Sequence, residues 1–146
     1  MLSTRPFTVL IADDDEEDRM LLEEAFMQNG LFDNSRFVED GEQTLAYLQE
    51  CFNPESGQTL PSLIILDVNM PLKNGIETLQ AIRADRRFRT IPVLMLTSSR
   101  AELAKAYRLG ANSYLVKPVH FADLIQMVKE LMNYWRDTVS LPMDSE

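Results

Sequence analysis

Four consecutive aliphatic residues, at positions 63–66, end abruptly at the carboxylate of Asp67. A run this short, followed by the turn-forming residues Asn69 and Pro71, predicts a strand that is buried on both faces. Such strands occur in parallel sheets covered by helices on both sides, where ligands bind at the carboxyl ends of the strands. Asp67 is therefore a candidate site residue, although an aspartate at such a place can also simply begin a turn.

Similar short apolar runs alternate with helical patterns along most of the chain. Further strands are expected at residues 7–12, 36–38, 91–96 and 113–116. Helices are expected between and after them: one ending at Gly30, one beginning at Gly41, and three at residues 75–85, 100–109 and 121–136. This alternation predicts an α/β fold, a doubly wound five-stranded parallel sheet with helices on both faces. Its usual strand order at this size is 2-1-3-4-5.

The length and composition fit a single globular domain. With 146 residues, of which 45% are hydrophobic and 25% charged, the chain can bury a core without disulfides or metal staples. We expect one domain over residues 7–136, an N-terminal lead at 1–6 and a short solvated tail at 137–146. The polar stretch at 53–61 contains prolines and a glycine and is expected to be a surface loop.

Charge and cysteine content exclude several classes of function. The net charge of −9 argues against nucleic-acid binding, because phosphate contacts need clustered lysine and arginine. The arginines at 83–89 are expected to form only a solvated face. Cys51 and His120 are the only cysteine and histidine, so neither an internal disulfide nor a Cys/His zinc site is available. No stretch is long enough to span a membrane or form a signal-peptide core, so we expect a cytoplasmic protein.

Polar residues stand at the ends of four of the predicted strands. They are Asp13 and Asp14 after the first strand, Asp67 after the third, Thr97 after the fourth and Lys117 after the fifth. Because the carboxyl ends of parallel strands share one edge of a sheet, these side chains are expected to lie together. Three carboxylates this close repel one another unless a cation is present, and their hard oxygen ligands suit Mg²⁺. The sequence therefore predicts a magnesium site at this edge.

The same residues suit phosphoryl chemistry. A hydroxyl at Thr97 can hydrogen-bond a phosphoryl oxygen, and Lys117 can pair with its charge. Asp67 can itself act as the nucleophile and form an aspartyl phosphate. Each residue also has an ordinary structural interpretation: Lys117 as a solvated lysine, Thr97 as a strand-end cap, and Tyr114 as a core aromatic with its hydroxyl at the surface.

These residues resemble the receiver domains of response regulators, the family typified by the chemotaxis protein CheY. The resemblance extends over about residues 7–136 and implies the flavodoxin-like, CheY-like fold of that family. The matching segments are the acidic pair Asp13-Asp14, the phosphoacceptor segment 66–71, the turn Asn74-Gly75, and Thr97 and Lys117-Pro118 at the family's spacing from Asp67. All of them match in register, which makes the resemblance specific.

The resemblance implies how the phosphoryl group and the metal would be bound. Asp67 would accept the phosphoryl group from the phosphohistidine of a sensor histidine kinase. Asp14 would bind Mg²⁺ directly and Asp13 largely through water, and Asn69 would supply its backbone carbonyl to the metal.

It also implies roles at the ends of the fourth and fifth strands. Lys117 would hold a phosphoryl oxygen, and a cis peptide bond between Lys117 and Pro118 would aim its side chain, since only an X–Pro bond adopts cis at low cost. Thr97 and Tyr114 would form the conformational switch.

Further details are similar to a narrower group, the small regulators that partner bacterial phytochromes. They are the loop at 53–61, the segment Ile91-Pro92-Val93, the run at 107–118 and the aromatic pair Tyr134-Trp135. This likeness implies a phytochrome-type kinase as the partner. Because the chain ends soon after Trp135, we expect a stand-alone regulator that acts through a partner, by self-association or by passing the phosphoryl group onward. A homodimer would form through the last helix and the fifth strand, where Met127 and Tyr134 add apolar surface.

Two rival functions use a similar sheet. A haloacid-dehalogenase-type phosphatase also has a strand-end aspartate nucleophile, but it needs a second acid two residues later, where this chain has Asn69. A phosphorylation-independent interaction module would keep the fold without the chemistry, and the full set of acids, threonine and lysine argues against it. We therefore expect a phosphoryl acceptor and not a turnover enzyme.

Overall fold

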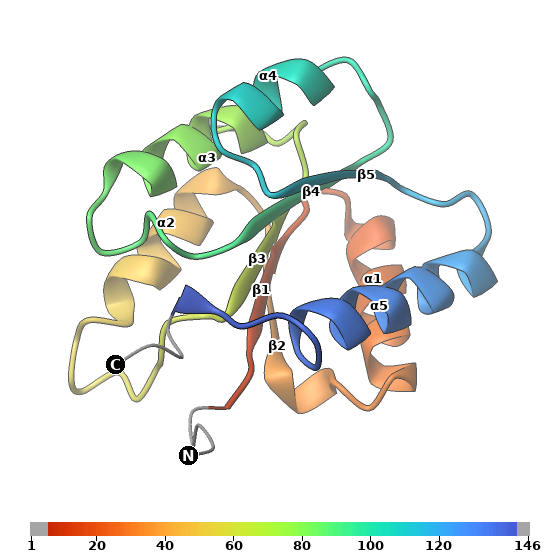
Figure 1. The fold of residues 1–146 in the computed structure, drawn as a ribbon, viewed down its shortest axis with the longest axis horizontal. Coiled ribbons are helices and arrows are strands. Elements are labelled where there is room, and N and C mark those ends of the chain that lie inside the picture. The colour runs from red at the N-terminus through yellow and green to blue at the C-terminus, as the bar shows by residue number, and fades with distance from the viewer. Residues whose placement is uncertain (1–5, 143–146) are drawn as a thin grey trace.

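The computed structural model describes residues 6–142 and has a parallel sheet at its centre (Figure 1). The strands in this part of the chain are β1 (Val9–Ala12), β2 (Ser35–Val38), β3 (Leu63–Leu66), β4 (Val93–Thr97) and β5 (Ser113–Val116). The helices are α1 (Glu16–Gln28), the short 3-10 helix η1 (Phe32–Asn34), α2 (Gly41–Glu50), α3 (Gly75–Ala84), α4 (Leu103–Arg108) and α5 (Phe121–Trp135). The strand order β2-β1-β3-β4-β5, with all pairs parallel, confirms the predicted doubly wound fold.

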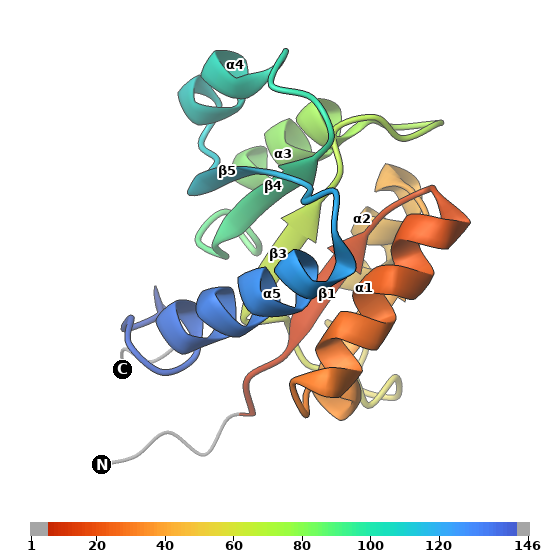
Figure 2. The ribbon, with the colours of Figure 1, turned by 90° about the vertical axis from the view of Figure 1, so that its right-hand side faces the viewer.

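Helices cover both faces of the sheet. Figures 1 and 2 show α1 and α5 together on one side and α2 and α3 on the other. Val9 and Ile11 pack into the core beneath α1 and α5, whereas Leu10 and Ala12 belong to the core beneath α2 and α3. Both faces are thus buried, which explains why the strands read as continuous apolar runs.

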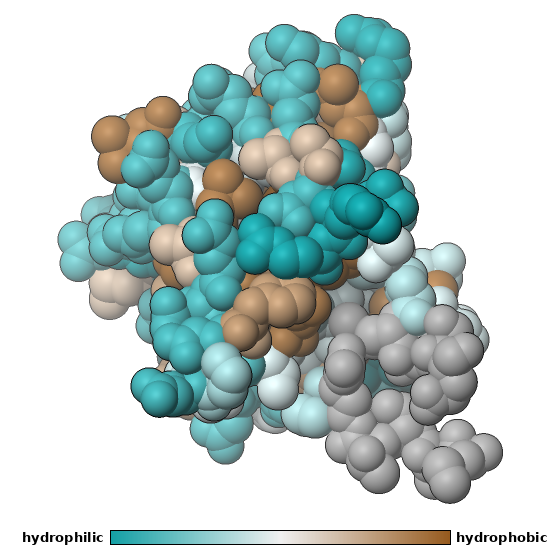
Figure 3. Space-filling view, turned by 90° about the vertical axis from the view of Figure 1, so that its left-hand side faces the viewer, coloured by the Kyte–Doolittle hydropathy of each residue, from teal (hydrophilic) through white to brown (hydrophobic). Residues whose placement is uncertain are grey.

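The outer surface differs from this core. On the side of the molecule that carries α2 and α3, hydrophilic residues predominate and apolar residues are scattered among them (Figure 3). None of the helices in residues 6–142 has the length and apolar character needed to cross a membrane.

The hydrogen-bond ladder of the sheet continues past the ends of β1, β3 and β5, and beyond β1 the amide of Asp13 donates to the carbonyl of Val38 (3.1 Å). The amide of Asp67 donates to the carbonyl of Ala12 (3.0 Å), and the amide of Lys117 donates to the carbonyl of Thr97 (2.9 Å). Asp13 follows Ala12 directly. These bonds fix the backbone from which each of the polar side chains projects, at one edge of the sheet.

The first turn of α3 is held close to Asp67 by capping hydrogen bonds and by the packing of Gly75. Asn74 and Glu77 form a capping box, in which the Glu77 amide donates to Asn74 Oδ1 (2.9 Å) and the Asn74 amide donates to Glu77 Oε1 (3.1 Å). Gly75, between them, packs against the backbone carbonyl of Asp67, where a Cβ atom would overlap the oxygen. Glycine is therefore the residue that allows this close approach.

Arg83 departs from the solvated face predicted for the arginines at 83–89. Its Nε donates to the carbonyl of Gly110 (2.9 Å) and one Nη donates to the carbonyl of Ile91 (2.8 Å). The other Nη donates to Asn112 Oδ1 (2.9 Å). The prediction was wrong for this residue because carbonyls of two separate turns converge on its guanidinium, which joins α3 to the turns before β4 and β5.

Two segments differ from the prediction, one in its burial and the other in the residue at which it begins. The tail was expected to be solvated from residue 137, but Leu141 is buried and Val139 packs against the core beneath α1 and α5. Their apolar side chains explain the difference, and residues 143–146 lie outside the described part. The helix expected at 100–109 begins only at Leu103, after a turn.

Candidate functional site

Three carboxylates meet at the carboxyl ends of β1 and β3. Asp13, Asp14 and Asp67 each offer an oxygen, and these atoms lie within 4.8 Å of one another. Asp13 is 1% exposed and Asp67 7%, whereas Asp14 is exposed. Backbone amides hold the two buried groups: the Asp15 amide donates to Asp13 Oδ1 (3.0 Å) and the Asn69 amide donates to Asp67 Oδ1 (3.2 Å).

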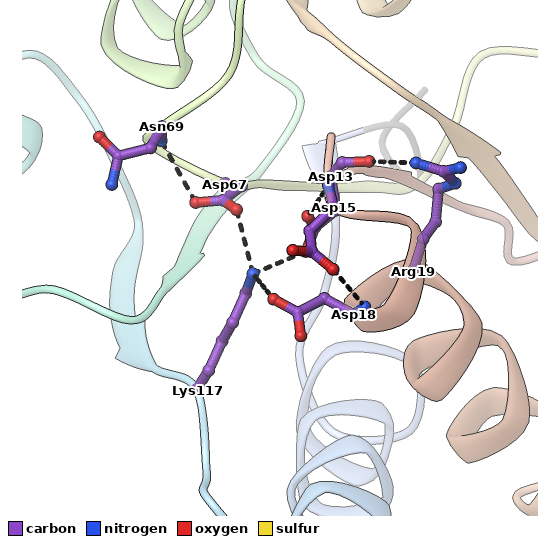
Figure 4. Close-up of polar contacts among 7 residues, drawn as sticks. All are labelled: Asp13, Asp15, Asp18, Arg19, Asp67, Asn69 and Lys117. Carbon is purple, nitrogen blue, oxygen red and sulfur yellow. Dashed lines mark hydrogen bonds and ion pairs between the residues drawn. The ribbon is translucent and has the colours of Figure 1, made fainter.

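The ammonium of Lys117 lies among these acids (Figure 4). Its Nζ donates to Asp13 Oδ2 (2.7 Å), to Asp18 Oδ2 (2.9 Å) and to Asp67 Oδ2 (3.0 Å). Burial lowers the pKa of Lys117, but the hydrogen bonds to Asp13 and Asp18 and the neighbouring negative charges outweigh it and hold the pKa above its ordinary value. Lys117 is therefore not a freely solvated lysine, which was the alternative interpretation of this residue from the sequence.

Burial acts on Asp13 in the opposite sense. It raises the pKa of Asp13 to about 6, and the hydrogen bond and charge of Lys117 offset only part of this. A single ammonium faces the carboxylates of Asp13, Asp18 and Asp67, so the group carries excess negative charge, which a further cation would stabilise. The donors are all hard oxygen atoms, the ligands that Mg²⁺ and Mn²⁺ prefer, so Asp13, Asp14 and Asp67 fit such an ion.

Thr97 ends β4 at the same edge and has no exposed surface (0%). Among the described residues no group pairs with its Oγ1. A buried hydroxyl without a partner costs about 1–3 kcal/mol, so its presence calls for an explanation. An oxyanion brought into the site would supply the missing acceptor.

Tyr114 is a buried residue of β5, and its hydroxyl forms a hydrogen bond. The hydroxyl donates to the carbonyl of Ser99 (2.7 Å), two residues beyond Thr97, and the Tyr114 amide donates to the hydroxyl of Tyr107 (3.0 Å). The hydroxyl is therefore tied to the β4–α4 loop and does not simply end at the surface, as the core interpretation assumed. This bond connects β5 to the segment that follows Thr97.

The expected cis peptide bond between Lys117 and Pro118 is not found. Residues 6–142 contain no cis peptide bond, so this prediction was wrong. The Lys117 side chain reaches three carboxylates from a trans backbone, since the ladder bond from its amide to Thr97 already orients the residue.

Asp18 was not among the residues expected from the sequence, yet it belongs to the site, because it accepts a hydrogen bond from Lys117. It lies on the first turn of α1, where acidic residues are common because they favour the helix dipole. Its position one turn beyond the Asp13-Asp14 pair was the available signal, because the first turn of a helix that follows a strand lies above the carboxyl end of that strand.

Comparison with known proteins places this geometry in a family. Residues 9–129 match the model of the response regulator receiver domain. The chain therefore belongs to the response regulator receiver domain family, whose members bind Mg²⁺ or Mn²⁺ at an acidic site and typically transmit signals without enzymatic activity.

Two relatives of similar length show which members of the family the chain resembles. The response regulator Rcp1 of Synechocystis sp. is 33% identical over 142 residues, which are 96% of each chain. The probable methanogenesis regulatory protein FilR2 of Methanothrix harundinacea is 36% identical over 132 residues, 89% of this chain and 84% of FilR2.

Solved structures agree with this placement. The phosphorylated cyanobacterial phytochrome response regulator RcpA superimposes with a TM-score of 0.84 at 30% identity. A response regulator in red light signaling of R. palustris has a TM-score of 0.84 at 35% identity, and the Mn²⁺-bound form of Rcp1 has 0.77 at 33%. Each comparison covers 94% of this chain and 99% of the other. The chain is thus a two-component response regulator homologous to Rcp1 and RcpA.

Proposed function

We propose that Asp67 accepts a phosphoryl group from a histidine kinase. The observation that carries this proposal is the position of the Asp67 carboxylate within the acidic group, 3.0 Å from the ammonium of Lys117. One oxygen of Asp67 forms a bond to phosphorus as the phosphorus–nitrogen bond to the kinase histidine breaks, and the electron pair returns to the imidazole nitrogen. Lys117 balances the negative charge on the transferring group.

The side chains of Asp13, Asp14 and Asp67, with the backbone carbonyl of Asn69, would hold a divalent cation, Mg²⁺ or Mn²⁺. When bound, such an ion supplies positive charge to the acids and to the phosphoryl oxygens. The three carboxylate oxygens, which lie within 4.8 Å of one another with a single ammonium beside them, support this set of ligands.

The buried hydroxyl of Thr97 would donate to a phosphoryl oxygen. A charge-assisted hydrogen bond of this kind contributes about 1.5–3 kcal/mol, comparable to the ~1–3 kcal/mol that couples allosteric sites. The bond from Tyr114 to Ser99, just beyond Thr97, supports a path by which a shift of Thr97 reaches β5. Thr97 and Tyr114 are in this sense the proposed switch.

The upstream partner is proposed to be a phytochrome-type histidine kinase in the cytoplasm. RcpA is a cyanobacterial phytochrome response regulator, the R. palustris relative acts in red light signaling, and both match 94% of this chain. The net charge of −9 supports a protein partner over nucleic acid. The free thiol of Cys51 fits a reducing compartment.

The output would be partner binding or self-association through β5 and α5. Side chains of both elements, among them Leu115, Met127 and Leu131, line a shallow hollow of about 390 Å³. Tyr134, at the end of α5, is 52% exposed. The surface over α2 and α3 offers only scattered apolar residues (Figure 3).

Labelling with acetyl phosphate tests the proposed function. The protein with Mg²⁺ is expected to gain one phosphoryl group, and both EDTA and the Asp67→Asn substitution are expected to abolish the gain. An Asp67→Asn variant that is still labelled at the native rate would overturn the assignment. Release of phosphate from an unrelated ester at a steady turnover would instead favour the phosphatase alternative.

A further inference from the structure

We propose that Asp18 is a positioning residue for Lys117 and keeps its ammonium in place while the phosphoryl group is transferred. This inference rests on the proposed function of Asp67. The ammonium has three N–H donors, and each has a carboxylate within hydrogen-bond distance: Asp13 at 2.7 Å, Asp18 at 2.9 Å and Asp67 at 3.0 Å. In Figure 4 the three acids surround Nζ from different elements.

The three acids differ in what else they must do. Asp13 and Asp67 belong to the group whose oxygens could hold a divalent cation, and Asp18 does not. Asp67 also changes its charge distribution when an oxygen bonds to phosphorus. The contact between Lys117 and Asp18 is therefore the one of the three that does not change when a metal binds or the phosphoryl group is transferred.

The position of Asp18 suits this task. It is the third residue of α1, and its amide donates to Oδ1 of the N-cap residue Asp15 (2.9 Å), so the backbone of the first turn is fixed. Its side chain is 41% exposed, against 2% for Asp13 and 9% for Asp67, so water shares in stabilising its charge.

A fixed partner matters because lysine is flexible. The four-carbon stem of Lys117 has many rotamers, and a catalytic charge is effective only when it is already in place at the transition state. Asp18 restricts Lys117 to conformations in which Nζ lies beside Asp67. Removing Asp18 is therefore expected to weaken the interaction of Lys117 with the phosphoryl group without removing the lysine itself.

A double-mutant cycle tests this role. Binding of beryllofluoride, which mimics the aspartyl phosphate, is measured with Mg²⁺ by titration calorimetry for the native chain, Asp18→Ala, Lys117→Ala and the double variant. Asp18→Ala is expected to weaken binding by about fivefold in the native background and to have no further effect in the Lys117→Ala background. The labelling rate with acetyl phosphate is expected to fall by about the same factor.

Glu16→Ala is the matched control, because it removes the same charge from the same helical turn and Glu16 has no hydrogen bond or ion pair with Lys117. It is expected to keep the affinity within about twofold. Thermal unfolding establishes that each variant is folded. The inference is overturned if Asp18→Ala binds as tightly as the native chain, or if it weakens binding equally in both lysine backgrounds. If the native chain binds no beryllofluoride with Mg²⁺, the proposed function itself fails and this inference fails with it.

Discussion

Gly75 lies so close to the backbone carbonyl of Asp67 that a Cβ atom at position 75 would overlap the carbonyl oxygen. The Gly75 amide donates to the carbonyl of Val68 (2.8 Å), so the start of α3 is held against the residue that follows the proposed phosphoacceptor. The position of Asp67 therefore depends on the absence of a side chain eight residues later.

Gly75→Ala is expected to destabilise the fold by about 1–3 kcal/mol, because the added methyl overlaps the Asp67 backbone and forces it to move. Labelling by acetyl phosphate is expected to slow for the same reason. Gly30→Ala is the control: a Cβ there meets no atom within 4 Å, but its φ of +73° makes the substitution cost about 1–2 kcal/mol. Urea unfolding is expected to show losses in both variants, and only Gly75→Ala is expected to lose labelling. Native labelling in Gly75→Ala would contradict the account.

Thr97→Val is expected to have opposite effects on stability and on binding. The substitution removes a buried hydroxyl that has no partner among the described residues, so the free energy of unfolding is expected to stay the same or rise by up to about 1 kcal/mol. Beryllofluoride affinity is expected to fall, since the proposed hydrogen bond is lost.

Thr44→Val provides the matched control for Thr97→Val. The Thr44 hydroxyl is buried and donates to the carbonyl of Asp40 (2.8 Å), which also accepts from the Thr44 amide, so its loss is expected to cost about 0.5–1.5 kcal/mol without changing beryllofluoride affinity. Denaturant unfolding and calorimetry measure both quantities. A Thr97→Val variant that is destabilised as much as Thr44→Val would show that Oγ1 has a structural partner.

Lys117→Met is expected to increase the stabilisation that Mg²⁺ confers. Without the ammonium, the buried carboxylates of Asp13 and Asp67 lose their cationic partner, so the variant is expected to unfold at a lower temperature in EDTA. The same excess negative charge strengthens cation binding, and a ligand that binds only the folded state raises its stability. The rise in Tm on adding Mg²⁺ is thus expected to be larger than in the native chain. An equal or smaller rise would mean that these acids do not bind the metal.

Arg83→Met is expected to destabilise the protein by about 1–3 kcal/mol, because it leaves the carbonyls of Gly110 and Ile91 without their donors. Labelling at Asp67 is expected to remain, since Arg83 lies away from the site residues. Arg86→Met is the control on the exposed part of the same arginine cluster and is expected to change stability by less than about 0.5 kcal/mol. Urea unfolding of the two variants distinguishes a structural arginine from a solvated one.

The parts of the structure that could be predicted follow from one physical regularity. A sheet buried on both faces requires continuous apolar strands, so the strands were visible in the sequence, and parallel strands bring their carboxyl ends to one edge. The proximity of Asp13, Asp14 and Asp67 followed from that topology alone. Their chemical roles remain predictions.

The parts that could not be predicted depend on contacts between distant segments. Acidic residues are common at helix starts, so Asp18 does not stand out in the sequence. Only its hydrogen bond with Lys117, 99 residues later, shows its role. Arg83 is bonded to Gly110, 27 residues away, which no local pattern reveals. The trans bond before Pro118 was also undetermined, since X–Pro isomers differ by only about 0.5–1 kcal/mol and tertiary context decides between them.

The most direct test of the central claim is to locate the phosphoryl group on the chain. After labelling with acetyl phosphate and Mg²⁺, reduction with borohydride converts an aspartyl phosphate to homoserine, which peptide mass spectrometry places in the sequence. The account predicts homoserine at position 67 and at no other aspartate. Homoserine at Asp13 or Asp14, or labelled protein with an unmodified Asp67, would contradict it.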